Sequence, residues 1–471
     1  MGVRNLLLVA YFFPPVGGGG VQRALKMAKY LPEFGWRPHV LAVDPVAHVS
    51  LDPSLLDQLP PEVVVHRVPE WVPPGLAKLV ARGGGVAPGG AGGADRAKGG
   101  GSEAAGTRQG APSLAASLRA RAVQLLKTAR KYVLIPDDQI LWYIPAVREG
   151  KKMLARYPID AVLSTAGPNT NHLVALALLR RRRLPWVADF RDPWTQNMHR
   201  SGIRWREALE ARMERRVMAT ADVVLTVTRS FAEGFREKHG DVIQRLEVIH
   251  NGFDAADYVG IEADRVPGKC VFAYAGIFYK ERNPRLFLRA VRELIDAGEI
   301  DRRDILLRFA GVFDYPGYTD NADAVAQLGL SDVVEVLGHL PHRRALALLK
   351  GADVLLLVGD TAPGSGAYIP GKLFEYMAVQ RPILALTLPG EAASIVERFR
   401  LGEVVRPDDL PGMKRAVASF YRRWKAGQLQ QSGVLPPEAY ALYERREQAR
   451  ALAALLDELT MQRKPAMASF S

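Results

Sequence analysis

Short apolar runs alternate with helical patterns along most of this chain, and this alternation constrains the fold more than any other feature. Such alternation is typical of a parallel β-sheet with helices on both faces. The alternation restarts about half-way along the 471 residues, a length that suits two domains. We therefore expect an α/β protein with two doubly wound, Rossmann-like domains, whose ligands bind at the carboxyl ends of the strands. The expected strands are Asn5–Ala10, Arg37–Val43, Val63–Val68, Ala161–Ser164, Trp186–Asp189, Val223–Val227, Leu246–Ile249, Val271–Ala275, Ile305–Ala310, Val333–Val336, Val354–Leu357, Pro382–Leu386 and Gly402–Val405.

The polar segment Asp254–Lys269, which contains a Pro-Gly pair, is the expected linker between the two domains. This gives a first domain over residues 1–257 and a second over residues 258–435. Residues 436–471 are expected to form a C-terminal helix, Pro437–Leu459, and a tail without regular structure.

Two segments of the first half depart from the alternation. Ala81–Pro112 is dominated by Gly and Ala, cannot bury enough apolar surface to order itself, and is expected to be a disordered insertion. Ser113–Val133 places apolar residues on one helical face and five Lys and Arg residues mostly elsewhere, which predicts a basic amphipathic helix. Such a helix can lie on a membrane surface or pack on a protein core, and the sequence leaves both readings open.

Composition narrows the partners and the compartment. A formal net charge of +13 favours acidic partners, and without a zinc-finger or RNA-binding signature it favours anionic lipid and phosphate-bearing substrates over nucleic acid. The single cysteine, Cys270, can form no internal disulfide, and the histidines lack metal-ligand spacing, so no metal site is expected. The apolar run Leu6–Phe13 is too short to span a bilayer. We expect a cytoplasmic protein that associates peripherally with the inner face of the plasma membrane.

A glycine-rich loop, Gly17–Gly20, follows the first expected strand and opens the first helix. Glycine lets the backbone approach a ligand, and the N–H groups at a helix N-terminus bind phosphate, so Gly18 and Gly19 are candidate ligand contacts. A dinucleotide fingerprint is the rival reading; Gln22 breaks its glycine spacing, although Asp44 ends the second strand as that motif requires. A simple tight turn is the third reading.

Polar residues follow two further strands of the first half. His172 lies in a run of small polar residues after the fourth strand, and Asp189 and Asp192 flank an arginine after the fifth. Carboxylates at the mouth of a sheet are costly unless they are paired or used, so this cluster is either part of a cleft or an Asp–Arg pair that fixes a loop. A histidine in such a position is more often a helix-capping or packing residue than a catalyst.

The second half carries two loops suited to a phosphate-bearing ligand. Lys280 and Arg282 lie in its first strand–helix loop, where they could neutralise a diphosphate, or could be solvated surface charges. Gly364–Ala378 is a glycine-rich loop that runs into a helix, with Lys372 in the first turn and Glu375 three residues later. A helix N-terminus and a lysine suit phosphate, whereas a carboxylate accepts hydrogen bonds from sugar hydroxyls.

In this order, these segments resemble the family 4 glycosyltransferases of the GT-B fold. Three pieces are specific in combination: the Pro-Pro and Gly-rich first loop, His250–Asp254, and Pro370–Met377. The resemblance covers nearly the whole chain except the insertion and the tail. It implies two Rossmann-like domains that face a central cleft, and a retaining enzyme that uses a nucleotide sugar and needs no metal or other cofactor.

The resemblance also implies roles for individual residues. The second domain would bind the donor, with Glu375 on the ribose, the Lys280–Arg282 pair on the diphosphate, and His339 near the base. The donor set that we expect is Gly18, Gly19, Gly276, Lys280, Arg282, His339, Gly371, Lys372 and Glu375. His172, Asp189 and Asp192 would line the acceptor side and assist catalysis.

One position departs from the family pattern. The family often has a second Glu, which contacts the donor sugar, eight positions before Glu375; here that position is Ala367. The resemblance implies a hexosyltransferase that acts on a glycan or lipid-linked acceptor in cell-surface polysaccharide or glycolipid biosynthesis. A nucleotide-sugar epimerase of the same fold, and a non-catalytic relative that binds nucleotide sugars or glycans, remain alternatives.

Overall fold

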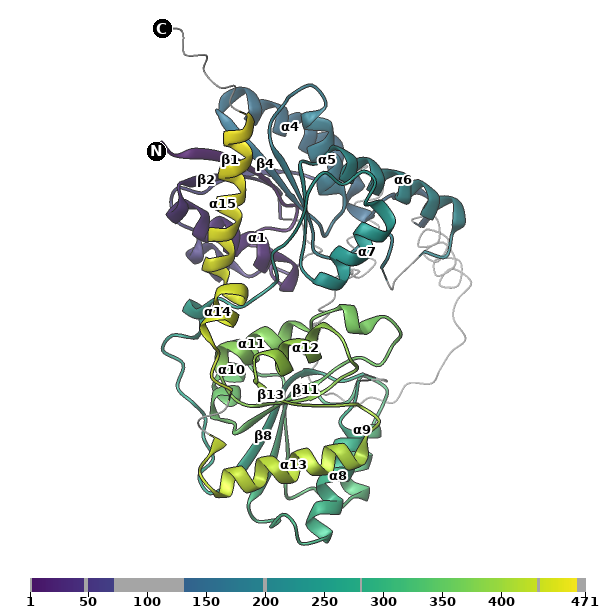
Figure 1. Ribbon diagram of the computed structural model, residues 1–471, viewed down its shortest axis with the longest axis vertical. Coiled ribbons are helices and arrows are strands. Elements are labelled where there is room, and N and C mark those ends of the chain that lie inside the picture. The colour runs from purple at the N-terminus through teal and green to yellow at the C-terminus, as the bar shows by residue number, and fades with distance from the viewer. Residues whose placement is uncertain are drawn as a thin grey trace, which may run out of the picture. The chain divides into compact units, whose positions relative to one another are not determined.

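The computed structural model describes residues 2–45, 50–71, 131–197, 201–279, 282–429 and 433–463, which fold into two compact units. Figure 1 shows both units, coloured along the chain. Unit 1 comprises Met1–Val227, Phe231–Val248 and Ala449–Ser471, and unit 2 comprises Thr228–Ser230 and Ile249–Gln448. Apart from Thr228–Ser230, unit 2 is therefore one continuous stretch of the chain, and the chain returns to unit 1 within its last helix.

Unit 1 is built on a seven-stranded parallel sheet in the order β3-β2-β1-β4-β5-β6-β7. The order reverses at β1, which places the carboxyl ends of β1 and β4 at the topological switch point of the sheet. The strands are β1 Arg4–Val9, β2 Trp36–Val43, β3 Val64–Val68, β4 Ile159–Thr165, β5 Trp186–Phe190, β6 Val223–Thr226 and β7 Leu246–Val248.

The helices of unit 1 bury apolar side chains against this sheet. One buried cluster joins Leu7 and Val9 of β1 to Trp142, Val174 and Phe235, which come from the helical layer. The last helix, α15, is held at the amino ends of β1 and β2, where Asp457 accepts hydrogen bonds from Arg4 at 2.8 Å and Trp36 at 2.7 Å. The helices are α1 Gly19–Tyr30, α4 Tyr143–Arg156, α5 Thr170–Leu179, α6 Arg204–Thr220, α7 Arg229–His239 and α15 Arg445–Arg463.

Unit 2 is built on a six-stranded parallel sheet in the order β10-β9-β8-β11-β12-β13. Its switch point lies between β8 and β11, which pair in parallel. The strands are β8 Cys270–Ile277, β9 Ile305–Val312, β10 Val334–Gly338, β11 Val354–Val358, β12 Ile383–Leu386 and β13 Gly402–Val405.

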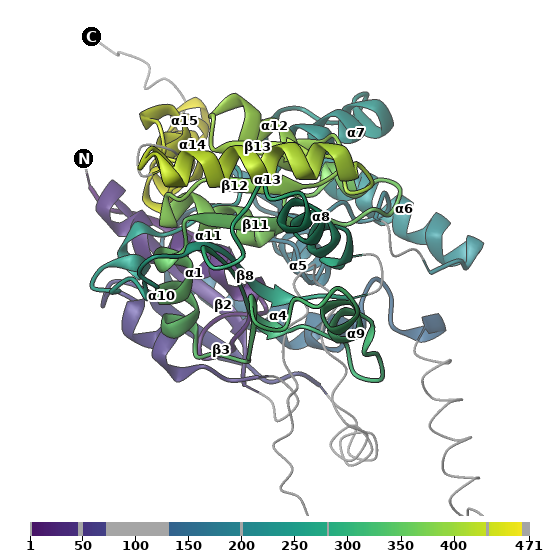
Figure 2. The ribbon, with the colours of Figure 1, turned by 90° about the horizontal axis from the view of Figure 1, so that it is seen from below.

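Two separate apolar clusters cover the two faces of the unit 2 sheet. One cluster takes residues from α8 Arg285–Asp296, α9 Asp320–Gln327 and α13 Leu410–Lys425. The other takes residues from α10 His342–Gly351, α11 Gly371–Val379, α12 Glu391–Arg398 and α14 Pro437–Tyr443. Figure 1 shows these two helical layers on opposite sides of the strands, and Figure 2 shows α13 crossing in front of the sheet beside α8.

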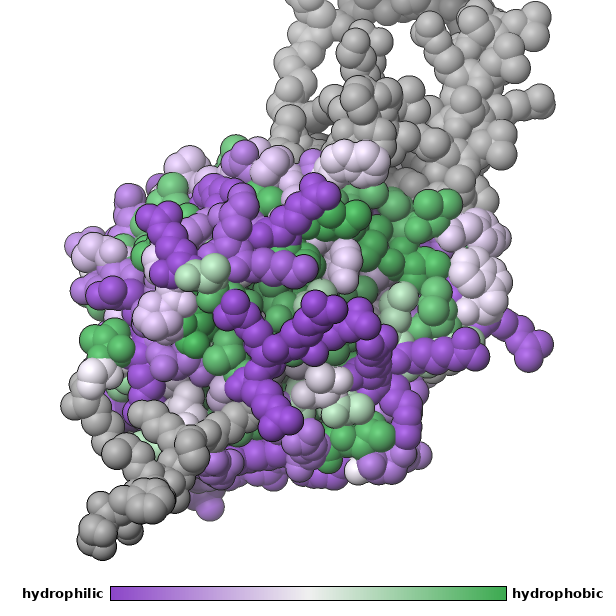
Figure 3. All heavy atoms as spheres, turned by 90° about the horizontal axis from the view of Figure 1, so that it is seen from above, coloured by the Kyte–Doolittle hydropathy of each residue, from purple (hydrophilic) through white to green (hydrophobic). Residues whose placement is uncertain are grey.

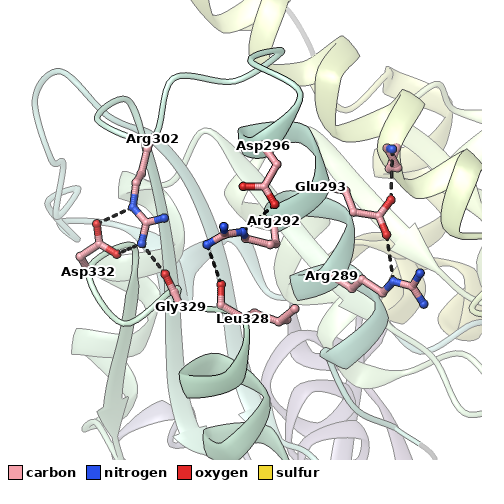
Figure 4. A network of polar contacts seen from close by, with 9 residues as sticks. Arg289, Arg292, Glu293, Asp296, Arg302, Leu328, Gly329 and Asp332 are labelled. Atoms are coloured by element: carbon pink, nitrogen blue, oxygen red, sulfur yellow. Dashed lines mark hydrogen bonds and ion pairs between the residues drawn. The ribbon is translucent and has the colours of Figure 1, made fainter.

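A group of ion pairs lies on the surface of unit 2 around α8. Figure 4 shows Arg292 of α8 reaching Asp296 and the Leu328 carbonyl, and Arg302 reaching Asp332. Arg289 of the same helix pairs with Glu293 at 2.9 Å. Exposed ion pairs of this kind contribute at most about 1 kcal/mol each to the stability of the fold. Burial of the two apolar clusters is therefore the main source of stability in unit 2.

The predicted α/β fold with two Rossmann-like domains is confirmed. Every expected strand is present, with ends that differ from the prediction by at most two residues. The division between the units falls at Val248–Ile249, before the predicted linker, and the chain from Ala449 onward belongs to unit 1. The insertion Ala81–Pro112 and all but the last three residues of the predicted basic helix Ser113–Val133 lie outside the described residues.

The prediction of one C-terminal helix over Pro437–Leu459 is wrong. Glu444 has extended backbone angles, φ −83° and ψ 135°, and separates α14 from α15. The break arises because Phe253 pairs with the chain at this point: its N–H donates to the Tyr443 carbonyl at 3.0 Å, and its carbonyl accepts from the Arg445 N–H at 2.8 Å. A helix cannot continue through a residue whose neighbours bond to another segment.

None of the helices in the described part of the chain combines the length and apolar character that a membrane crossing requires.

Candidate functional site

Two glycines make room for a lysine at the switch point of the unit 2 sheet. Gly276 near the end of β8 has φ +148°, and a Cβ atom there would lie 2.4 Å from the Lys372 Nζ. Gly311, its partner on β9, has φ +102°, and a Cβ atom there would lie 2.2 Å from the Gly276 carbonyl oxygen. Gly276 thus leaves space for the Lys372 ammonium group, and Gly311 lets β9 approach the Gly276 backbone closely.

Lys372 and Arg282 converge at this point. The Lys372 Nζ lies 5.3 Å from the centre of the Tyr274 ring, and burial together with the nearby Arg282 charge lowers the Lys372 pKa to about 8. The Arg282 guanidinium stacks 5.1 Å over the Tyr279 ring, and its buried Nε has no hydrogen-bond partner among the described residues. The Asp360 carboxylate is 3.9 Å from this guanidinium. Two half-buried cations, of which only Arg282 has an ion pair in the described part of this region, and that a long one, form a site that a bound anion would stabilise.

The N-terminus of α11 opens beside these cations. Pro370 is the N-cap residue and supplies no side-chain cap, so the first N–H groups of the helix have no capping side chain. The preceding loop is held against the β12–α12 turn, since a Cβ atom on Gly366 would lie 2.6 Å from the Pro389 carbonyl oxygen. An uncapped helix N-terminus beside a lysine is an anion-binding arrangement.

Glu375 lies one turn further along α11 in a largely buried position. Burial raises its pKa, and the positive charges of His342 and Lys372 oppose that rise. Tyr258 contacts the same region, and burial and then the Glu375 charge raise its pKa. The carboxylate therefore lies between α10, α11 and the segment that precedes β8, where it can accept hydrogen bonds from a polar ligand.

The structure brings most of the predicted donor residues together. Gly276, Arg282, Gly371, Lys372 and Glu375 lie around the switch point of unit 2, whereas Lys280 lies outside the described residues. His339 is exposed on the segment that joins β10 to α10.

The sequence analysis did not identify Tyr274, His342 or Asp360 as site residues. His342 is the first residue of α10, so a helix that begins beside the His-Leu-Pro stretch was the available signal. Tyr274 lies within the second half of β8, and Asp360 follows β11, at the edge of the sheet where site residues gather in this fold.

In unit 1, the glycine-rich loop opens helix α1 at the carboxyl end of β1. Gly18 has φ +96° and is the N-cap residue, without a side-chain cap. A Cβ atom on Gly19 would meet nothing within 4 Å. The loop therefore needs glycine at position 18 for its backbone conformation and is open at Gly19, and its helix N-terminus lacks a side-chain cap, like that of α11.

A fully buried ion pair connects this loop to β5. The Arg23 guanidinium of α1 donates two hydrogen bonds of 2.9 Å to the two Asp189 carboxylate oxygens, and the Thr165 hydroxyl donates a third at 2.7 Å. Burial opposes ionisation of Asp189, yet its pKa lies below the ordinary value because of Arg23. Asp189 is thus an ionised and fully bonded carboxylate with no exposed surface.

Arg191 is bound to main-chain carbonyls of two neighbouring loops. It donates to the Gly20 carbonyl at the start of α1 and, at 3.4 Å, to the Gly167 carbonyl after β4. Gly167 has φ +77°, and a Cβ atom there would lie 2.2 Å from an Arg191 nitrogen. The arginine between Asp189 and Asp192 therefore joins the loops after β1, β4 and β5.

His172 lies in the first turn of α5 and is fully buried. Its Nδ1 is 2.8 Å from the Ser164 hydroxyl, and its ring stacks on Phe190 with centroids 4.3 Å apart. Burial lowers its pKa to about 3, so the imidazole is neutral at physiological pH. Its Nε2 is buried without a hydrogen-bond partner among the described residues. This nitrogen is the one unsatisfied polar atom that His172 can offer to a ligand.

Asp192 is half-buried, unlike the enclosed His172 and Asp189. Glu214 of α6 binds the loop that contains Asp192 by accepting a hydrogen bond of 3.1 Å from the Thr195 N–H. Glu214 also accepts a hydrogen bond of 2.9 Å from the Lys238 ammonium. The three predicted catalytic residues thus lie near one edge of the unit 1 sheet, and Asp192 is the most accessible of them. Among the described residues, no group of three or more His, Cys, Asp or Glu side chains has the geometry to hold a metal ion.

Two family models match adjacent parts of this chain. The Glycosyltransferase Family 4 model matches residues 107–257, and the Glycosyl transferases group 1 model matches residues 269–423. Together they cover most of both units.

The similar proteins carry related names. The 2-deoxystreptamine glucosyltransferase of Streptomyces kanamyceticus is 25% identical over 53% of this chain and 65% of its own length. WcaL of Escherichia coli (strain K12), named as a colanic acid biosynthesis glycosyltransferase, is 36% identical over 20% of this chain and 24% of its own length. The chain therefore aligns with less than two thirds of either curated relative.

Solved structures share the fold at low identity. A glycosyltransferase from Rickettsia africae ESF-5 superposes with a TM-score of 0.58 over 98% of this chain and 99% of that one, at 12% sequence identity.

Proposed function

Because this chain belongs to the GT-B glycosyltransferases that the family 4 and group 1 models describe, we propose that it transfers a sugar from a nucleotide-sugar donor to a glycan or lipid-linked acceptor. The acceptor belongs to the synthesis of a cell-surface polysaccharide or glycolipid. The name of the colanic acid relative supports this choice of pathway class.

The convergence of Lys372 and Arg282 at an uncapped helix N-terminus carries this proposal. The Lys372 pKa of about 8 reflects burial and repulsion from Arg282, which disfavour its charged form in the absence of an anion. A diphosphate would relieve that repulsion and accept hydrogen bonds from both side chains and from the first N–H groups of α11. In the reaction, the same groups stabilise the charge that develops on the leaving diphosphate.

The remaining donor contacts follow from the position of this diphosphate. Glu375, one helical turn beyond Lys372, accepts hydrogen bonds from the ribose hydroxyls. Lys280 adds a third cation, beside Lys372 and Arg282, to the diphosphate, and His339 lies near the base. Main-chain amides of Gly364–Tyr368 bind the transferred hexose in place of the carboxylate that Ala367 lacks. Gly18 and Gly19 of unit 1 approach the diphosphate through backbone N–H groups.

The catalytic proposal gives different tasks to the three unit 1 residues. Asp192 is the contact that assists the acceptor hydroxyl, because its side chain is half-buried. Neutral His172 offers its unsatisfied Nε2 to a sugar hydroxyl. Asp189 acts as a positioning residue through Arg23, since its oxygens are already occupied. The reaction proceeds with retention at the anomeric carbon and without a bound metal.

A lipid-linked acceptor requires the enzyme to work at a membrane. The net charge of +13 supports a peripheral position of unit 1 on anionic lipid at the inner face of the plasma membrane.

A binding screen tests the donor assignment. Calorimetry of the purified full chain against UDP, GDP, ADP and dTDP and their common sugars should give binding to one nucleotide series, and slow hydrolysis of the matching sugar in the absence of acceptor. Donor turnover should persist in a chelator. Interconversion of free nucleotide sugars would instead identify an epimerase, and the absence of binding to every nucleotide would overturn the donor site.

The Gly19→Val variant tests the unit 1 loop. The structure leaves space for a side chain at this position, so the fold should be unchanged by circular dichroism. Donor turnover should be lost, because the branched side chain would keep the diphosphate from the backbone. Turnover within a few-fold of the wild type would show that this loop is only a turn.

A further inference from the structure

The outward side of helix α6 carries aromatic and basic side chains that no step of the proposed reaction uses. We define the α6 patch as Trp205, Arg212 and Arg216 with the neighbouring Tyr132 and Val133. We propose that the α6 patch is the surface through which this protein docks on an anionic lipid bilayer. The inference rests on the proposed function, since a lipid-linked acceptor requires such docking, and it adds which surface meets the membrane.

The helix geometry places three patch residues on one stripe. Successive residues of an α-helix are rotated by about 100°, so Arg212 and Arg216 each fall within about 20° of Trp205. All three side chains are exposed. The stripe therefore runs along the outer side of α6 for about three turns.

The acidic residues of α6 are kept away from this stripe. Glu214 is fully buried on the opposite side, where the Lys238 ammonium at 2.9 Å and the His239 ring at 3.0 Å bond to it. Hydrogen bonds to these groups lower its pKa to about 2 despite its burial. Glu207 accepts a hydrogen bond of 2.9 Å from the Gly202 N–H.

Glu210, the remaining acid of the helix, is paired with Arg206. The three carboxylates of α6 thus face the protein or have partners, and the outward stripe carries only positive charge. An ordinary solvated helix mixes the two signs on its outer face, so this segregation favours a negatively charged partner.

Aromatic and aliphatic side chains stand beside the arginines. The Trp205 ring is 52% exposed and stacks on the Tyr132 ring, which is 48% exposed, with centroids 6.4 Å apart. Val133 next to it is 72% exposed. Arg206 holds the two segments together through the Lys131 and Pro136 carbonyls. The two rings stack on each other and stay about half exposed to solvent, so they present apolar area that a partner would cover.

This combination fits a lipid headgroup layer better than a nucleic acid or a protein. Trp and Tyr rings prefer the boundary between headgroups and acyl chains, and arginine forms strong hydrogen bonds to lipid phosphates. The exposed Val133 gains from an apolar boundary and gains nothing from a nucleic-acid backbone. Figure 3 shows hydrophilic and apolar side chains interspersed over the face of unit 1 seen from above.

Co-sedimentation of the full chain with vesicles tests the inference. Phosphatidylcholine vesicles that contain phosphatidylglycerol should bind the protein in a salt-sensitive manner, and pure phosphatidylcholine should bind it weakly. Each basic residue near such a surface contributes about 1 kcal/mol, so the Arg212→Gln, Arg216→Gln double variant should bind at least tenfold more weakly. Trp205→Ala should weaken binding by several-fold, and the Trp205 emission should shift to the blue when vesicles are added to the wild type.

A matched control removes the same charge elsewhere in unit 1. Arg181→Gln, Arg183→Gln lowers the net charge by two at an exposed turn after α5, and its binding should stay within about threefold of the wild type. Equal losses in the two double variants would overturn the α6 patch in favour of net charge. Binding to RNA that Trp205→Ala weakens, with no binding to vesicles, would overturn it in favour of nucleic acid. Donor turnover without vesicles is the separate readout for the proposed function, and it should be equal in all these variants.

Discussion

Both Rossmann-like units have cationic side chains near the carboxyl ends of their strands, but the partners of these cations differ between the units. In unit 1, Arg23 is paired through two bonds with Asp189, and Arg191 is bound to two carbonyls. In unit 2, burial and the nearby Arg282 charge lower the Lys372 pKa to about 8, and the Asp360 carboxylate lies 3.9 Å from the Arg282 guanidinium.

This difference separates a structural use of charge from a binding use. The unit 1 pair satisfies itself and fixes the relative position of α1 and β5. The unit 2 pair is incomplete without an anion, so its electrostatic energy is available to a ligand. Both units have a glycine-rich loop at a helix N-terminus, and the pairing of the cations is the difference on which we base the proposed donor site in unit 2.

The largest expected effect is on the stability of unit 1. Arg23→Met leaves Asp189 as an unpaired buried charge, which costs about 3–5 kcal/mol. Chemical denaturation should detect this loss as an early transition of unit 1. Nucleotide affinity of unit 2 should be unchanged under conditions where the variant is still folded. Wild-type stability in Arg23→Met would remove the distinction between the two units.

The next effect is on nucleotide affinity. Lys372→Met should weaken binding of the nucleoside diphosphate by about 10- to 100-fold, the equivalent of one charge-assisted hydrogen bond of about 1.5–3 kcal/mol. Its melting temperature should stay the same or rise, because a poorly solvated charge is removed. Lys425→Met, which removes an exposed lysine of α13, is the matched control and should bind normally. A large loss of stability in Lys372→Met would show that this lysine is structural, like Arg23.

A smaller loss is expected from Glu375→Gln, which keeps the shape of the side chain and removes its charge. Nucleoside diphosphate and nucleotide sugar should each bind about tenfold more weakly, because the ribose hydroxyls lose a charged acceptor. Calorimetry measures both ligands. If only the melting temperature shifts, Glu375 acts merely on the α11 dipole, and the donor assignment of this loop must be withdrawn.

The smallest effect is the pH dependence of donor binding. The Lys372 pKa of about 8 lies below its ordinary value, so the cation is present below pH 8 and is lost as the pH rises through that value. Nucleotide affinity at pH 8 should be about half of its value on the acidic side, where the lysine is fully charged. Lys372→Arg, whose guanidinium keeps its charge, should abolish this dependence. A dependence of equal size in Lys372→Arg would assign it to another group.

Most of the strands were predictable because they are short, apolar and buried, as Val354–Val358 is. The strands β3, β7 and β10 are only partly buried, and the alternation of strands with helices was the signal for them. The placement of Lys372 and Glu375 on one helix after a glycine-rich loop was also predictable, since they are three residues apart and the glycines precede them in the sequence, whereas their role in donor binding stays a prediction.

The buried pair of unit 1 could not be predicted in the same way. Arg23 and Asp189 are separated by 166 positions in the sequence, and only the strand order brings α1 next to β5. The burial of His172 could not be predicted for the same reason, because Ser164 of β4 and Phe190 of β5 enclose the histidine ring. The break at Glu444 likewise depends on Phe253, almost two hundred residues away.

The return of α15 to unit 1 sets the order in which the chain can complete its folding on the ribosome. Residues 449–463 bury Leu452 and Leu456 and bind Arg4, Trp36 and Arg245, but they are translated only after the whole of residues 249–448. At a translation rate of about 5–20 residues per second, the surface of unit 1 that α15 covers stays exposed for about 10–40 s. Unit 2, whose segments after Ile249 are contiguous, is complete first. A nascent chain stalled within this interval would therefore present a finished unit 2 and an exposed apolar strip on unit 1, which is the kind of surface that chaperones bind.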